Sequence, residues 1–185
     1  MAGDMLRLHD LESVIPVLAS HRTGGGRPID FNLIHRSIDV ELPSDYQEFS
    51  RSYPAIEIDE FLRIFSPVPG REEEFIQEIY EELEILKDLC GEGEDDLAGG
   101  NVPFPREGGL FPWGSSLSGD SFYWKVSSDN GDEWPVVVGG RNGDWWEFEG
   151  GMLAFLVGLI DGTVERRGLP RDIPSRSPRV HVFDD

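Results

Sequence analysis

The stretch 102-VPFPREGGLFPWG-114 and the segments 121-SFYWKV-126, 134-WPVVV-138 and 145-WWEF-148 decide the fold of this chain. They contain all five of its tryptophans. The last three segments are rich in aromatic and β-branched residues, and turns containing Gly, Asn and Asp separate them, which predicts an antiparallel meander of three strands. No nucleophile, general base or metal-ligand pattern lies beside them. This half of the chain therefore indicates a recognition scaffold rather than a catalyst.

Signals for short helices occur before this region. Asp10 and Asp30 each precede an apolar pattern of helical period, so we expect each to cap a short helix. Ser44 and Gln47 have the spacing of a capping box. This spacing predicts a helix over 44–52.

Strand and helix periodicities alternate along the rest of the chain. Segment 55–65 alternates apolar with polar residues and predicts one or two strands. The period becomes helical at Arg71, which predicts the longest helix, followed by an acidic, glycine-rich loop. A closing helix is expected over 152–160, and an extended tail with one late strand over 180–183. The apolar stripe of the longest helix consists of Phe75, Ile79, Leu83, Leu86 and Cys90.

The charge of the 185-residue chain limits its partners. Its formal net charge is -20, from 36 acidic and 16 basic residues. A field of this sign repels phosphate backbones and anionic headgroups, so we expect no nucleic-acid or membrane partner. It attracts basic proteins. The alternative is that the charge serves only solubility, and composition leaves both interpretations open.

Motifs for catalysis, cofactors and disulfides are absent from the sequence. Cys90 is the only cysteine, which excludes an intramolecular disulfide and a cysteine zinc cluster. The four histidines are scattered, and no nucleotide-binding, zinc-protease or serine-hydrolase motif is present. We expect no catalytic residue, no cofactor and no metal; a hydrolase with an unrecognised site is a separate hypothesis. The N-terminus has no signal-peptide pattern, which predicts a cytoplasmic protein.

Several motifs occur in a fixed order over roughly residues 30–162. They read LPSDYQEF, IFSP, a long acidic helix, PFPREGGLFPWG, GDSFYWKV, EWPVVV and WWEFEGGMLAFL. This ordered set resembles the SUKH superfamily of Smi/Knr-like domains, and the GGLFPWG block is its most specific part. The residues that carry the motif are Pro43, Tyr46, Gly108, Gly109, Pro112, Trp113, Gly114, Asp120, Trp124 and Trp134.

The resemblance implies a fold and a function. The implied fold is a single α+β domain with a central, curved antiparallel sheet flanked by helices. It is preceded by a helix and Gly-rich turn in 1–29 and followed by an Arg/Pro-rich tail in 163–185. Bacterial members of the family are mostly immunity proteins, which implies a non-enzymatic domain that binds and neutralises a cognate toxin, in some cases a nuclease. The alternative is an intracellular regulatory adaptor of the same fold.

Carboxylates are concentrated in 72–96, which holds twelve acidic residues and Lys87 as its single base. One interpretation is a solvated helix face. The other is a surface that mimics a phosphate row and covers a basic cleft of the partner. The expected partner-binding carboxylates are Glu78, Glu81, Glu82, Asp88, Glu92, Glu94, Asp95 and Asp96, and the four in the loop are the preferred candidates.

Aromatic residues offer a second kind of contact. Trp145 and Trp146 are adjacent on a predicted strand and must point to opposite faces, so at least one is expected to be partly exposed and to anchor the partner. Trp113 and Trp124 are expected to be scaffold or, alternatively, walls of a groove. Gly108-Gly109 predicts positive φ in a tight turn, and Pro112 with Trp113 predicts a rigid corner under the sheet. We expect a monomer or weak dimer with a basic protein partner.

Overall fold

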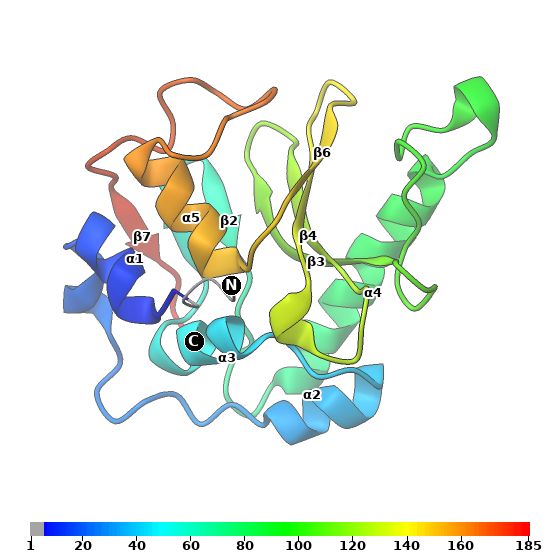
Figure 1. Ribbon diagram of the computed structural model, residues 1–185. Coiled ribbons are helices and arrows are strands. Elements are labelled where there is room, and N and C mark those ends of the chain that lie inside the picture. Colours follow the sequence, from blue (N-terminus) through cyan, green and yellow to red (C-terminus); the bar gives the residue numbers. More distant parts are fainter. Residues whose placement is uncertain (1–5) are drawn as a thin grey trace.

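A computed structural model describes residues 6–185 as an α+β fold with one open, antiparallel sheet (Figure 1). The predicted fold class is confirmed. Residues 1–5 of the expected N-terminal segment lie outside the described residues. The sheet has the order β6-β5-β4-β3-β2-β1-β7. Its strands are β1 (Ile56–Ile58), β2 (Leu62–Ile64), β3 (Leu110–Ser116), β4 (Ser121–Lys125), β5 (Val136–Gly139), β6 (Trp145–Phe148) and β7 (Val180–Val182).

Helices cover the two faces of this sheet unequally. The helices are α1 (Leu8–Val14), α2 (Phe31–Ile38), α3 (Ser44–Ser52), α4 (Glu72–Leu89) and α5 (Met152–Asp161), with short 3-10 turns η1 (Leu18–His21), η2 (Gly93–Asp95) and η3 (Gly131–Glu133). Helices α1, α3 and α5 pack on one face, whereas α4 lies on the other (Figure 1).

Alternation along the strands builds two apolar clusters. The main core includes Phe155 of α5 and the side chains that face it, such as Trp113 and Phe122, with ring centroids 6.1 and 5.9 Å from it. On the opposite face, Tyr123 packs with Leu86 of α4 in a smaller cluster, whereas Phe75, Ile79 and Leu83 of α4 belong to the main core. The predicted apolar stripe of α4 is buried from Phe75 to Leu86, and Cys90 is half-buried.

The strand β3 is the main feature that the sequence analysis missed. The expected corner at Pro112 is wrong, because Leu110–Ser116 is a central strand paired with both β2 and β4. Its register with β4 shifts between Pro112 and Gly114, and such a bulge tolerates a proline within a sheet. Gly108 has the expected positive φ of 67°, but Gly109 does not. Gly109 instead allows close packing, because a Cβ there would lie 2.6 Å from the Arg106 carbonyl oxygen.

Helix starts agree only in part with the predicted caps. Asp30 is confirmed as a cap, since its carboxylate accepts the backbone N–H three residues on at 2.9 Å. The helix expected to start after Asp10 begins earlier, and the Asp10 carboxylate accepts the N–H of Arg7, the N-cap residue, at 2.7 Å. The helix predicted over 44–52 is confirmed, but its N-cap is Pro43 rather than Ser44. The first error displaces a helix start and the second changes only the cap residue.

The meander β4-β5-β6 is confirmed, but one of its turns differs from the expected hairpin. Asn130 caps η3, and its side chain accepts the N–H of Asp132 at 3.2 Å. A Cβ on the buried Gly131 would lie 2.7 Å from the Glu41 carbonyl oxygen. Asp132 in turn accepts the N–H of Ser44 at 2.6 Å. The connection is therefore shaped by docking against the start of α3, which local sequence does not encode.

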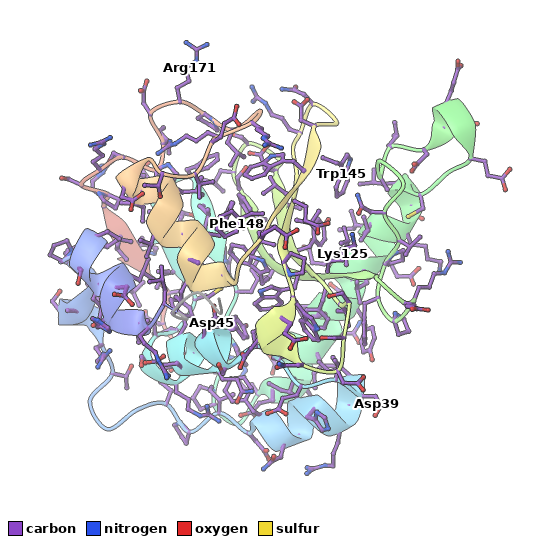
Figure 2. All side chains as sticks on the ribbon, viewed as in Figure 1. Asp39, Asp45, Lys125, Trp145, Phe148 and Arg171 are labelled. Carbon is purple, nitrogen blue, oxygen red and sulfur yellow. The ribbon has the colours of Figure 1, made fainter. Side chains whose placement is uncertain are left out.

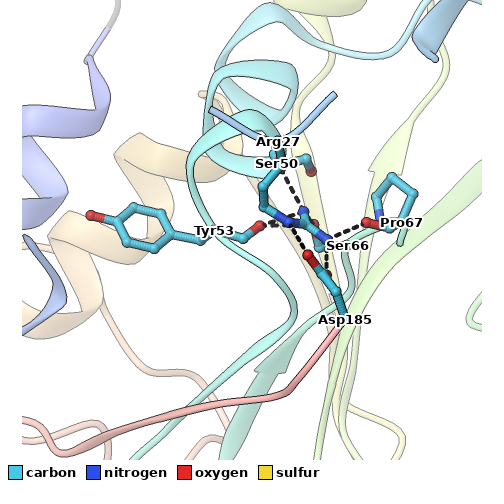
Figure 3. Close-up of polar contacts among 6 residues, drawn as sticks. All are labelled: Arg27, Ser50, Tyr53, Ser66, Pro67 and Asp185. Atoms are coloured by element: carbon cyan, nitrogen blue, oxygen red, sulfur yellow. Dashed lines mark hydrogen bonds and ion pairs between the residues drawn. The ribbon is translucent and has the colours of Figure 1, made fainter. Parts of the chain in front are cut away.

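The C-terminal segment belongs to the same sheet. The expected late strand is confirmed as β7, which pairs with β1 at the edge. The chain end also reaches a buried cation, because the Asp185 carboxylate lies against the guanidinium of Arg27, whose side chain is 1% exposed. The other acceptors around this guanidinium are Ser50 O, Tyr53 O, Ser66 Oγ and Pro67 O (Figure 3).

Candidate partner-binding site

One flank of α4 borders the part of the sheet that this helix does not cover. Near β3 and β4, α4 packs through the buried Leu86. Toward β2 and β1, the same sheet face carries Arg63 and Glu57, which are register partners, and Arg63 is exposed. A pocket of ≈ 260 Å³ therefore lies between the helix and β2. This α4 groove is lined by Arg63, Phe65, Phe75, Glu78, Ile79, Glu81, Glu82 and Ile85.

The floor of the α4 groove is apolar. Phe75 and Ile79 are buried at its base, and Phe65 is half-buried. Ile85 is 57% exposed, although full burial of such an apolar side chain is favourable by about 1.5–3 kcal/mol. Apolar surface is thus available to a ligand at the point where the helix faces the sheet.

The rim of the α4 groove is anionic. Among the described residues, none of the three glutamates Glu78, Glu81 and Glu82 forms an ion pair. Partial burial raises the pKa of the Glu82 carboxyl, and the negative charges of Glu78 and Glu81 raise it further. Arg63 does not neutralise them, because its guanidinium lies over the Phe183 ring, 4.3 Å from the centroid. These carboxylates therefore form a site that favours an external cation.

A second pocket begins one helical turn further along the same flank, at Leu89. This Trp145 pocket has a volume of ≈ 520 Å³. The ring of Trp145 stacks on Tyr123 with centroids 6.0 Å apart, and its Nε1–H donates to the Leu97 carbonyl oxygen at 3.0 Å. Its other lining residues are Asp96, Gly99, Gly119, Ser121, Gly139, Gly140, Arg141, Asn142 and Gly143.

The two predicted tryptophan anchors have different environments. Trp145 lies on the side of β6 that faces α4 and the acidic loop, whereas Phe148 lies on the side toward α5 (Figure 2). Trp146 also faces α5, with its ring 5.9 Å from that of Phe155, and Arg167 lies over it. The two indoles therefore point to opposite faces, as expected. Only Trp145 lies beside the carboxylates.

Trp145 also holds the acidic loop in place. Ideal Cβ atoms on Gly99 of the loop and Gly139 of β5 would each lie 2.7 Å from the Trp145 ring. The absence of side chains at these two positions lets the indole fit between loop and sheet. The same residue that offers aromatic surface thus positions the loop.

The predicted acidic residues of the loop play two roles. Glu92, Glu94 and Asp95 are exposed on a segment that projects from the end of α4 (Figure 1). Asp96 is a structural residue, because its carboxylate accepts the N–H groups of Ala98 and Gly100 at 3.0 and 2.6 Å. Asp88 is exposed on α4 and lines neither of the two pockets.

The motif tryptophans are core residues. The alternative that Trp113 and Trp124 form groove walls is wrong, because both are 0% exposed. Tyr46 packs edge-on against Trp124 at 5.0 Å and donates its hydroxyl hydrogen to the Phe65 carbonyl oxygen at 2.9 Å. Trp134 Nε1–H donates to the Ser128 carbonyl oxygen at 2.8 Å.

Asp120 and Asp45 are buried carboxylates with structural contacts. Asp120 accepts the Ser116 hydroxyl at 2.5 Å and the Arg141 N–H at 3.0 Å, which fixes the β3-β4 turn. Asp45 accepts the N–H of Leu153, in the first turn of α5, at 3.1 Å. Among the described residues, its other oxygen is buried without a hydrogen-bond partner, and burial raises the pKa of Asp45 to about 6.

The described residues 6–185 contain neither a clustered set of metal ligands nor a helix that could span a membrane. Within this range, no group of three or more His, Cys, Asp or Glu residues is placed to hold a metal ion. No helix in the same range combines the length and apolar character needed to cross a bilayer. Comparisons of the chain with protein-family models, curated proteins and solved structures found no match.

Proposed function

We propose that this chain is a non-enzymatic protein-binding domain whose partner presents a basic surface to α4. The observation that carries the proposal is the α4 groove, where Glu78, Glu81 and Glu82, which form no ion pair among the described residues, stand beside an apolar floor and the exposed Ile85. The exposed loop acids lie at the end of the same helix. With a net charge of -20, the domain attracts a basic partner and accelerates its encounter.

The proposed partner is a toxin that this domain neutralises. The ordered motifs of roughly residues 30–162 resemble the SUKH superfamily, and that resemblance supports an immunity protein. A nuclease toxin has a cationic cleft for its substrate. Carboxylates arrayed along a helix and a loop suit such a cleft, because they supply the charges that phosphates would otherwise supply.

Coupled binding and protection assays test this function. The polypeptide encoded immediately upstream of this gene, or its C-terminal domain, is expressed in cells with and without this chain, and the purified pair is titrated by calorimetry. We expect growth arrest without the chain, rescue with it, and a stable complex. A complex without growth arrest favours the regulatory adaptor. The absence of both binding and protection contradicts the immunity proposal.

A further inference from the structure

We infer that the α4 groove is a socket for a single arginine side chain of the protein partner. The inference rests on the proposed protein-binding function and names the contact that anchors it. A socket for arginine must fit one side chain, offer apolar contact to its methylene groups and present several hydrogen-bond acceptors to its guanidinium.

The size of the groove limits its occupant. Its volume of ≈ 260 Å³ is below the range of about 300–1,000 Å³ that is typical of small-molecule pockets. A groove of this size, open toward the sheet face beside Arg63, accommodates one long side chain. It does not enclose a cofactor.

The apolar floor matches the stem of a long cationic residue. Arginine places its methylene groups along apolar surface while its guanidinium stays at the polar edge. Phe65 and Ile85 line the groove and offer such surface, and the 57% exposure of Ile85 leaves it free for contact. An aromatic wall also favours the planar guanidinium, which stacks on ring faces.

The carboxylates of the rim match the head group. Glu78 and Glu82 are four residues apart on α4, so they lie on the same flank, and Glu81 lies beside them. A guanidinium has five N–H donors in a fixed plane and bonds to more than one carboxylate, whereas an ammonium group acts as a point charge. Partial burial is the main cause that raises the pKa of the Glu82 carboxyl, and the negative charges of Glu78 and Glu81 raise it further; a bound cation relieves this repulsion.

The positive charge of Arg63 provides a further test of the socket. It lines the groove, yet its guanidinium is stacked on Phe183 at 4.3 Å and forms no ion pair with the three glutamates. Its positive charge therefore opposes an incoming arginine. Arg63→Gln is expected to tighten binding. A loss of affinity in this variant contradicts the inference, because it would mean that Arg63 supports the groove or contacts the partner favourably.

The first experiment uses a partner-independent probe. N-acetyl-L-arginine amide is titrated to millimolar concentration into the ¹⁵N-labelled chain, with the matching lysine and norleucine amides as controls. We expect amide shift changes confined to the groove, larger for the arginine probe, and reduced in Glu78→Gln/Glu82→Gln. The double variant Glu84→Gln/Asp88→Asn is the matched control, because it removes the same charge from α4 outside the groove. Shifts that are absent, scattered or equally reduced in both variants overturn the inference.

The second experiment uses the protein partner and separates the two proposals. We expect Glu78→Gln/Glu82→Gln to raise Kd by about tenfold or more, since hydrogen bonds to charged groups are lost, and the control variant to change it less than about threefold. If the partner binds and the two variants change its Kd equally, the arginine socket is contradicted, whereas the protein-binding function still holds. If the partner does not bind the unmodified chain, the proposed function is contradicted. The titration with the arginine amide then still tests whether the groove binds an arginine side chain.

Discussion

The Asp185 carboxylate closes the hydrogen-bond shell of Arg27, 158 residues earlier in the chain. Arg27 Nε–H donates to Asp185 Oδ2 at 2.9 Å, and a terminal guanidinium nitrogen donates to Oδ1 (Figure 3). The remaining donors reach backbone carbonyls of α3 and of the segments that follow α3 and β2. One buried cation therefore joins Asp185 to α3 and to the segments that follow α3 and β2.

Asp185→Asn is predicted to lower the free energy of unfolding by about 1–2 kcal/mol. It removes the negative charge beside a buried cation, and the partial exposure of Asp185 reduces the cost below that of a fully buried pair. Chemical denaturation at neutral pH measures the change. Asp184→Asn is the matched control, because Asp184 is exposed and has no such contact. Equal stability of the two variants contradicts the structural role of Asp185.

Trp145→Ala is predicted to loosen the acidic loop. The variant removes the hydrogen bond to Leu97 and the packing against Gly99. Hydrogen exchange at Ala98 and Gly100 is expected to accelerate by roughly fivefold, since one hydrogen bond contributes about 1 kcal/mol. Trp146→Phe, on the opposite face, is expected to leave these amides unchanged. Unaltered protection of Ala98 and Gly100 in the Trp145→Ala protein would show that the loop holds its own shape.

Asp45 predicts a pH dependence of stability. Burial is the main cause that raises the pKa of this carboxyl from 3.8 to about 6, and the charges of Asp132 and Glu48 add to the effect, while the Leu153 N–H opposes it. The folded protein therefore retains a proton that the unfolded chain has lost over this range. The contribution of Asp45 to the unfolding free energy falls as pH rises from 3.8 to about 6, by a total on the order of 3 kcal/mol.

The comparison with Asp45→Asn isolates this contribution, because the other carboxylates titrate alike in both proteins. Denaturation curves are measured from acidic to neutral pH. We expect the stability of the unmodified chain, relative to the variant, to decrease steadily as the pH rises through this window. If the unfolding free energies of the two proteins change in parallel with pH, the predicted contribution of Asp45 is contradicted.

Elements with a strong local signal were predictable from the sequence. The α4 stripe and the β4-β5-β6 meander follow from residue periodicity and are present in the structure. The strand β3 was not predictable in this way, because Pro112 and its neighbouring glycines indicate a turn. Its strand geometry depends on pairing with β4 and with β2, and β2 is separated from it by α4 and the acidic loop. The pairing with β2 joins residues that are far apart in the sequence, which local patterns do not predict.

The acidic rim of the candidate site was predictable, but its apolar floor was not. Glu78, Glu81 and Glu82 stand out by composition. Phe65 and Ile85 become part of one groove only when α4 packs across the sheet. One signal was available: Ile85 is a large apolar residue that lies off the apolar stripe of its own helix, between Glu84 and Leu86. A residue of this kind marks surface that folding leaves uncovered.

The salt dependence of affinity for the proposed partner, the polypeptide encoded immediately upstream, tests the central claim most directly. It is measured for the unmodified chain and for Glu92→Lys/Glu94→Lys/Asp95→Lys, in which Asp96 is kept because it holds the loop. We predict that affinity falls as ionic strength rises, mainly through slower association, and that the lysine variant binds more weakly at low salt. Affinity that stays constant from low to high salt, or an unimpaired lysine variant, would contradict an acidic binding face.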